Sequence, residues 1–174
     1  MLLKISNTKA YIQISPKWCA GTTNTKKRNR KMLQAALDRA QAKNKNLPFQ
    51  SLSHSRQVGG FALADKPIGF DLESKPREIS EKATRWFSRP AELKAVKSSL
   101  ILWVMKEAAF KALRGPNQPE NLRQIKITNA RRVSQNEKIE FSFQVTGGKR
   151  SRSRGRGLAI SNSRTIMGIA VVLT

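Results

Sequence analysis

The sequence has little of what secreted and membrane proteins need. It contains a single cysteine, Cys19, so no disulfide can form within the chain, and a reducing compartment is expected. Its longest uninterrupted apolar run, Leu100 to Met105, is far shorter than the roughly 20 residues that span a bilayer. The first 15 residues alternate polar and apolar types and lack the apolar core of a secretion signal. We therefore expect a soluble cytoplasmic protein that makes no use of a membrane.

Acidic residues are also scarce. The 174 residues include 11 Asp and Glu against 34 Lys and Arg, which gives a formal net charge of +23. This charge exceeds what solubility requires and predicts a strongly anionic partner. Nucleic acid, anionic lipid, a phosphate-rich cofactor and an acidic protein all remain open, because charge alone does not rank them. A hydrophobic content of 39% indicates a folded body and not a disordered basic tail.

Hydrophobic periodicity and turn residues predict an α+β protein. Helices are expected over residues 32–44, over 78–88, and in a segment that ends near Leu113. Strands are expected over residues 2–14, 49–55, 57–64, 68–73, 122–128, 138–145 and 165–173. No internal repeat and no linker divides the chain, so one compact body is predicted.

Two segments concentrate basic residues. The first, "KKRNRK" at residues 26–31, leads into a helix and suits either a solvated helix start or a phosphate-binding role. The second runs from Lys149 to Arg156 and alternates arginine with serine and glycine. This composition suits RNA-binding segments, but its position between strands favours a solvated loop with nonspecific affinity for anions.

Two acids lie two residues apart in the apolar strand "IGFDLE". Side chains alternate along a strand, so Asp71 and Glu73 share one face, with Cα atoms about 6.6–6.8 Å apart. Two carboxylates at this separation can share a bound cation. The alternative is a solvent-facing polar edge, which the apolar surroundings disfavour.

A third acid lies in the mostly apolar helix "ILWVMKEAAFKAL". Helical spacing aligns Trp103, Glu107 and Lys111, and it places Lys106 about 100° to one side of Glu107. A simple Glu107–Lys111 pair would contribute only ~0.3–0.5 kcal/mol, which hardly explains charge on a core helix. If Glu107 faces the strand acids, the three carboxylates form an oxygen-rich site suited to Mg²⁺, and Lys106 and Lys111 would hold phosphate.

The only histidine, His54, lies in "SLSHS", on the strand before the acid pair. It is either a structural hydrogen-bonding residue or, with Ser53 and Ser55, a set of donors for a phosphate group. The sequence leaves both interpretations open.

Taken in order, "SLSHS", "PIGFDLE", "RWFS" and "WVMKEAAFKAL" resemble the signature segments of the 4′-phosphopantetheinyl transferases, in particular the larger pseudo-dimeric type. The resemblance is strong from Phe49 to Gly115 and loose over the later strands. It implies two unequal, similar lobes, each with a helix packed on a small antiparallel sheet. It also implies that the protein transfers phosphopantetheine from coenzyme A to a serine of an acyl or peptidyl carrier protein and releases 3′,5′-ADP.

By motif position, the resemblance makes Asp71, Glu73 and Glu107 the Mg²⁺ ligands, and Glu107 also the candidate base. Lys106 and Lys111 match motif lysines, with Lys111 on the pyrophosphate. His54 and Ser53 match the segment that meets the coenzyme A phosphates.

The part of the chain before Phe49 is shorter than the usual N-terminal half. We therefore divide the chain into a shortened lobe, 1–48, and a transferase core, 49–174, within one compact unit. Lys26, Arg28 and Lys31 are candidates for the 3′-phosphate of coenzyme A. A monomer is favoured, and self-association stays possible if the small lobe cannot complete the cleft.

The rival functions are a basic RNA-binding or ribosome-associated protein and an inactive relative that acts as a binding module. We expect no specific nucleic acid partner.

Overall fold

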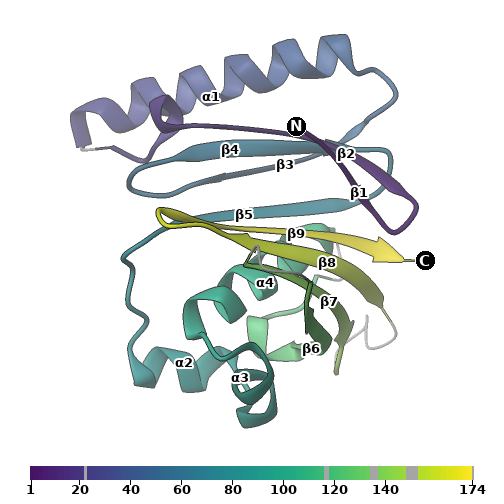
Figure 1. The fold of residues 1–174 in the computed structure, drawn as a ribbon. Helices are drawn as coiled ribbons and strands as arrows, with labels where there is room; N and C mark the ends of the chain where they lie inside the picture. Colours follow the sequence, from purple (N-terminus) through teal and green to yellow (C-terminus); the bar gives the residue numbers. More distant parts are fainter. Residues whose placement is uncertain (22, 116–117, 134–136, 148–152, 174) are drawn as a thin grey trace.

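The computed structural model describes residues 1–21, 23–115, 118–133, 137–147 and 153–173 (Figure 1). The first part of the chain forms β1 (Leu2–Ile5), β2 (Thr8–Ser15), the 3₁₀ helix η1 (Pro16–Trp18), α1 (Thr23–Lys43), β3 (Phe49–His54) and β4 (Gly59–Ala64). The remainder forms β5 (Ile68–Ser74), α2 (Glu81–Phe87), α3 (Pro90–Val96), α4 (Ser99–Ala112), the 3₁₀ helix η2 (Leu122–Gln124), β6 (Ile125–Arg132), β7 (Lys138–Val145), β8 (Arg154–Ser161) and β9 (Thr165–Leu173).

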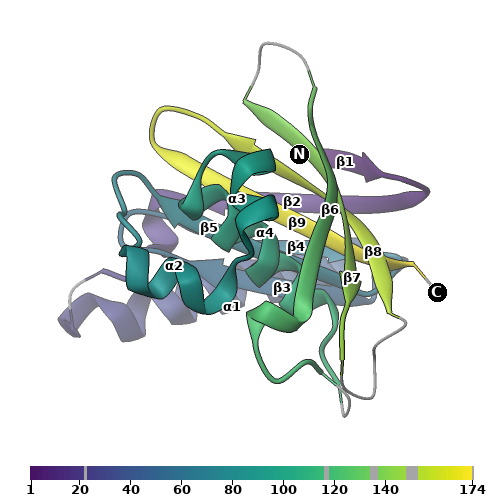
Figure 2. The same cartoon turned by 90° about the horizontal axis from the view of Figure 1, so that it is seen from below.

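These strands form two antiparallel sheets. The first has the order β1-β2-β4-β3 and the second has the order β5-β9-β8-β7-β6. Figure 1 shows α1 on the outer face of the first sheet, and Figure 2 shows α2, α3 and α4 gathered beside the curved strands of the second. The expected α+β class, with two lobes that each pack a helix on an antiparallel sheet, is confirmed.

Each layer is held to the next by its own group of buried apolar side chains. Between α1 and the first sheet, Leu33 and Leu37 pack with Phe61. Between the two sheets, Ile12 packs with Phe70 and Ile169. Beneath α4, the core comprises Leu102, Met105, Ala108, Ala109, Phe141 and Phe143, among others. Because apolar residues lie on both sides of each sheet, burial of their surface stabilises the whole stack of layers.

Glycine and alanine let α4 lie unusually close to β5. A Cβ atom at Gly69 would lie 1.8 Å from the carbonyl oxygen of Ala108 and 2.4 Å from the backbone nitrogen of Ala112. On β9, a Cβ at Gly168 would lie 2.7 Å from the carbonyl oxygen of Val104. The sheet therefore presents bare backbone to the helix, and this close approach brings the polar side chains of α4 to those of β5.

We expect Gly69→Ala to destabilise the protein by about 1–3 kcal/mol, because the added methyl overlaps helix backbone that cannot rotate away. Urea unfolding monitored by circular dichroism should show a lower midpoint with an unchanged slope. An unchanged midpoint would mean that α4 does not rest on Gly69.

The structure corrects several expected boundaries. Residues 2–14 form a hairpin, since the chain turns at Ser6, which has a positive φ of 55°. The segment expected as one helix up to Leu113 is two helices, because Lys97 adopts the left-handed conformation at the end of α3.

The region around the second basic segment was also predicted wrongly. Residues 154–161 form β8, a strand that we did not predict, so Arg154 and Arg156 are strand residues and not loop residues. The other basic residues of that segment, 149–152, lie outside the described residues. The first sheet takes strands from residues 2–64, and the division of the chain after residue 48 stays a prediction.

No helix within the described ranges combines the length and the apolar character that crossing a membrane would require.

Candidate functional site

The centre of the candidate site is Asp71, a 5%-exposed carboxylate on β5, the edge strand beside β3. Its Oδ1 atom accepts a hydrogen bond from the Ser53 hydroxyl at 2.9 Å and pairs with the Lys111 ammonium at 2.6 Å. Its Oδ2 atom is buried and has no hydrogen-bond partner among the described residues. A buried carboxylate oxygen without a partner is costly, so its position calls for a physical explanation.

The other two acids lie within electrostatic range of Asp71. Burial raises the pKa of Glu107, and the charge on Asp71 raises it further, while Lys111 and Arg77 oppose that shift. Burial is also the main cause that raises the pKa of Glu73, ahead of the opposing ion pair with Arg77 and the added repulsion from Asp71 and Glu107. The structure therefore brings together the three acids that the sequence singled out.

The three acids do not form a closed metal cage. Within the described part of the chain, no three Asp, Glu, His or Cys side chains stand close enough together to hold a metal ion. The donor set nevertheless fits a hard cation such as Mg²⁺, which prefers a few carboxylate oxygens plus water and phosphate. Asp71 Oδ2 has no hydrogen-bond partner in the described structure, and a cation would offset the repulsion from neighbouring acids that adds to the effect of burial on the pKa of Glu73 and of Glu107.

The expected alignment of Trp103, Glu107 and Lys111 along α4 is visible in their contacts. The Cζ atom of Arg77 lies over the Trp103 ring, 5.5 Å from the centroid of that ring. Trp103 also packs edge-on against Phe87. Arg77 also pairs with Glu73, so it connects the first turns of α4 to the acid strand. One turn further along, Lys111 reaches Asp71.

His54 lies at the end of β3 and remains exposed. Partial burial lowers its pKa, and the nearby cations Arg30, Lys26 and Lys111 lower it further, in that order. The start of α1 therefore lies within electrostatic range of His54. Lys26 is one of the expected phosphate-binding residues and Arg30 is not, although a helical spacing of four residues puts the two on one face.

His54 and Glu73 line the same surface hollow. Its volume is about 640 Å³, and its lining includes the basic residues Arg56, Lys75 and Arg77. Glu107 lines a second hollow of about 570 Å³, whose walls are largely apolar and include the aromatic residues Trp86, Phe87, Trp103 and Phe110. Trp86 is 76% exposed, which is unusual for so large an apolar side chain. A basic hollow and an apolar hollow thus lie on either side of the acid cluster.

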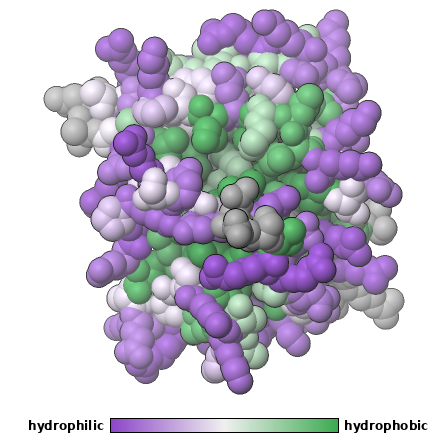
Figure 3. All heavy atoms as spheres, viewed as in Figure 1, coloured by the Kyte–Doolittle hydropathy of each residue, from purple (hydrophilic) through white to green (hydrophobic). Residues whose placement is uncertain are grey.

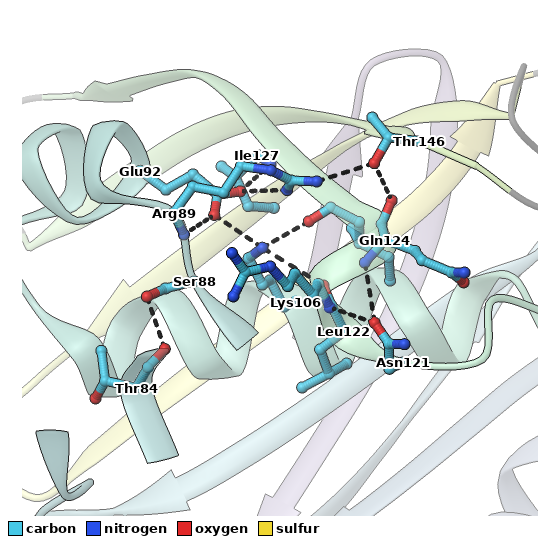
Figure 4. A network of polar contacts seen from close by, with 12 residues as sticks. Thr84, Ser88, Arg89, Glu92, Lys106, Asn121, Leu122, Gln124, Ile127 and Thr146 are labelled. Carbon is cyan, nitrogen blue, oxygen red and sulfur yellow. Dashed lines mark hydrogen bonds and ion pairs between the residues drawn. The ribbon is translucent and has the colours of Figure 1, made fainter. Parts of the chain in front are cut away.

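Lys106 is not brought to this cluster. We expected it to hold phosphate, but its side chain is fully buried. Its ammonium lies 2.9 Å from a carboxylate oxygen of Glu92 (Figure 4). It also donates to the Ile125 carbonyl at 2.6 Å. Lys106 and Glu107 point in different directions because they lie about 100° apart around the helix. Lys106 therefore turns under α4 toward β6, while Glu107 faces β5.

The Lys106–Glu92 pair belongs to a buried polar network. Glu92 also accepts hydrogen bonds from the backbone nitrogens of Arg89 and Ile127, both at 2.8 Å (Figure 4). Burial lowers the pKa of Lys106 to about 8, although Glu92 opposes the shift. The network ties α4 to α3 and β6, and it therefore fixes the helix that carries Glu107 and Lys111.

We expect Lys106→Ala to destabilise the fold by about 3–5 kcal/mol, because it leaves Glu92 as an unpaired buried charge. The double variant Lys106→Met with Glu92→Gln should recover part of this loss by removing both charges. Chemical denaturation of the two variants, with the exposed Lys82→Ala as control, measures the effect. A loss for Lys106→Ala no larger than that for Lys82→Ala would contradict a structural role.

Two comparisons with known proteins bear on this arrangement. A search of the curated proteins finds none that matches the chain. The family model described as the 4′-phosphopantetheinyl transferase superfamily matches residues 67–160, which is just over half of the 174 residues and includes Asp71, Glu73, Glu107 and Lys111. The matched region runs from β5 through α4 to β8, and it therefore covers the strand and the helix on which the acid cluster is built. The chain belongs to the 4′-phosphopantetheinyl transferase superfamily, a family of transferases.

Proposed function

We propose that this protein transfers the 4′-phosphopantetheine group of coenzyme A to a serine hydroxyl of an apo acyl or peptidyl carrier protein, with Mg²⁺, and releases 3′,5′-ADP. The observation that carries this proposal is the gathering of Asp71, Glu73, Glu107 and Lys111 on β5 and α4, within the region that matches the superfamily. The proposed acting form is a monomer. The lone cysteine favours the cytoplasm as its location.

Coenzyme A would bind in the basic hollow at the junction of the lobes. His54 lines that hollow with Arg56, Lys75 and Arg77, and Lys26 and Arg30 lie close enough to His54 to lower its pKa. This concentration of cations suits the 3′-phosphate and the pyrophosphate of coenzyme A. Lys111 lies at the acid cluster, where its ammonium can pair with the pyrophosphate.

Asp71, Glu73 and Glu107 would hold Mg²⁺. When bound, Mg²⁺ neutralises the pyrophosphate and stabilises the charge that develops on its oxygens. Asp71 would offer its buried, unpartnered Oδ2 atom. Lys111 and Arg77 supply counter-charge to Asp71 and Glu73 in this structure, and they can turn from these acids toward phosphate oxygens.

Glu107 is the proposed general base. The carrier serine oxygen forms a bond to the phosphorus that bears pantetheine, and the bond between that phosphorus and the bridging oxygen breaks. The bridging oxygen leaves with the electron pair as part of 3′,5′-ADP, and the serine proton passes to Glu107. Glu107 lines the hollow from which the carrier would approach, so its carboxylate is placed to accept that proton.

The carrier protein would approach from the apolar hollow beside Glu107. Trp86, Phe110 and Leu122 offer apolar contact there, and basic side chains around the protein would attract an acidic carrier. Figure 3 shows hydrophilic side chains over much of the rim of the face it presents. The high net charge thus has a use in steering both substrates.

The proposal is tested by chromatography of the nucleotide product after the protein is incubated with coenzyme A, Mg²⁺ and an apo carrier. We expect 3′,5′-ADP to form in proportion to the carrier supplied. Chelation of the metal, or a carrier whose acceptor serine is replaced by alanine, should prevent its formation. Release of 3′,5′-ADP without a carrier would indicate hydrolysis of coenzyme A and would contradict the proposed transfer.

A further inference from the structure

Ser53 makes contacts that its motif does not predict. It was expected to meet the coenzyme A phosphates, yet its side chain is buried, at 7% exposure, between β3 and β5. Its hydroxyl oxygen accepts a hydrogen bond from the backbone nitrogen of Leu72 at 3.2 Å. Because a backbone N–H can only donate, the single hydroxyl proton of Ser53 is free to point to Asp71 Oδ1, 2.9 Å away.

This contact determines which oxygen of Asp71 remains available. Oδ1 is occupied by Ser53 on one side and by Lys111 on the other. Oδ2 is buried without a hydrogen-bond partner in the described structure. If Lys111 turns to a phosphate group, the Ser53 hydroxyl is the contact that still fixes the carboxylate.

We propose that Ser53 is a positioning residue that holds the Asp71 carboxylate so that Oδ2 faces the metal ion, and that it does not bind coenzyme A. The inference rests on the proposed metal site and deepens it. Removal of a residue that hydrogen-bonds to a metal ligand commonly weakens metal binding 10–100-fold. Ser53 would act on the metal only through Asp71.

The neighbouring serine provides a matched control. Ser51 lies two residues earlier on β3, is also buried, and accepts a hydrogen bond from the backbone nitrogen of Phe70 at 2.9 Å. Ser51→Ala and Ser53→Ala therefore each leave one backbone N–H of β5 without its acceptor. Only Ser53→Ala also removes a hydrogen bond from Asp71.

The experiment measures two affinities. Binding of Mn²⁺, as a spectroscopic substitute for Mg²⁺, is followed by the loss of the free-ion electron paramagnetic resonance signal with coenzyme A at a fixed concentration. Binding of coenzyme A is measured by equilibrium dialysis without metal. We expect Ser53→Ala to weaken Mn²⁺ binding about 10-fold or more. Its affinity for metal-free coenzyme A should stay within about twofold of that of the wild type.

Ser51→Ala should change neither affinity, and Ser53→Thr, which keeps a hydroxyl, should restore Mn²⁺ binding. The inference is overturned if Ser53→Ala binds Mn²⁺ as Ser51→Ala does, or if it loses coenzyme A affinity as His54→Ala does. It is also overturned if the wild-type protein binds no Mn²⁺. If Ser53→Ala weakens Mn²⁺ binding in a protein that fails to modify any carrier, the positioning role stands and the proposed transfer fails.

Discussion

Glu107→Gln should lower kcat for phosphopantetheine transfer by about 10²–10⁴-fold, because the amide cannot accept the serine proton. It also removes one negative charge from the proposed metal site. The fold should be unaffected, since burial and Asp71 already raise the pKa of Glu107 and make its charge unfavourable in the folded state. Glutamine has nearly the same shape as glutamate but no charge, so Glu107→Gln removes the cost of the buried charge at little steric cost.

The measurement is steady-state transfer at saturating coenzyme A and carrier, together with thermal unfolding of each protein. Glu140→Gln is the matched control, because Glu140 is exposed on β7 and pairs only loosely with Arg131, at 3.5 Å. Turnover by Glu107→Gln close to that of Glu140→Gln would show that Glu107 is neither base nor ligand. A loss of stability that parallels the loss of kcat would show that Glu107 acts through the fold.

Lys111→Ala should lower kcat by about 10²–10³-fold, as expected when a donor aimed at developing charge is removed. Its ammonium lies 2.6 Å from Asp71 at the acid cluster, and in the proposed mechanism it pairs with the pyrophosphate there. Saturating coenzyme A should not restore the rate, because the deficit lies in the transition state and not in ground-state binding alone.

Joint replacement of Arg154 and Arg156 by alanine provides the comparison. Both are exposed residues of β8, so their loss should raise the apparent KM for an acidic carrier and leave kcat nearly unchanged. Rising salt should reduce the difference in apparent KM between that variant and the wild type, because salt screens the attraction between the arginines and the acidic carrier. An equal loss of kcat in both variants would place these arginines in the reacting centre.

The sequence predicts much of the candidate site because several site residues lie close together along one strand or one helix. The two-residue period of β5 places Asp71 and Glu73 on one face, and the helical period of α4 aligns Glu107 with Lys111. The contact between α4 and β5 could be expected only from the family resemblance. Its physical cause is the bare backbone at Gly69 and Gly168, which no periodicity reveals.

The contacts and the strand that the sequence does not predict also have physical causes. Lys106 and Ser53 are polar residues in the expected motifs, and nothing in the local sequence shows that Glu92 or Asp71 would bind them internally. Their partners lie 14 and 18 residues away along the chain, so only the tertiary fold brings them together. The strand β8 was missed because its glycines and arginines suit a loop, whereas in the sheet Gly155 and Gly157 make room for the rings of Phe143 and Phe141.

The most direct test of the central claim is the intact mass of an apo carrier protein after incubation with the wild-type protein, coenzyme A and Mg²⁺. The proposed function predicts a gain equal to one phosphopantetheine group on the carrier, located on its acceptor serine by fragmentation. An unchanged carrier mass, for a carrier that an established phosphopantetheinyl transferase does convert under the same conditions, would contradict it.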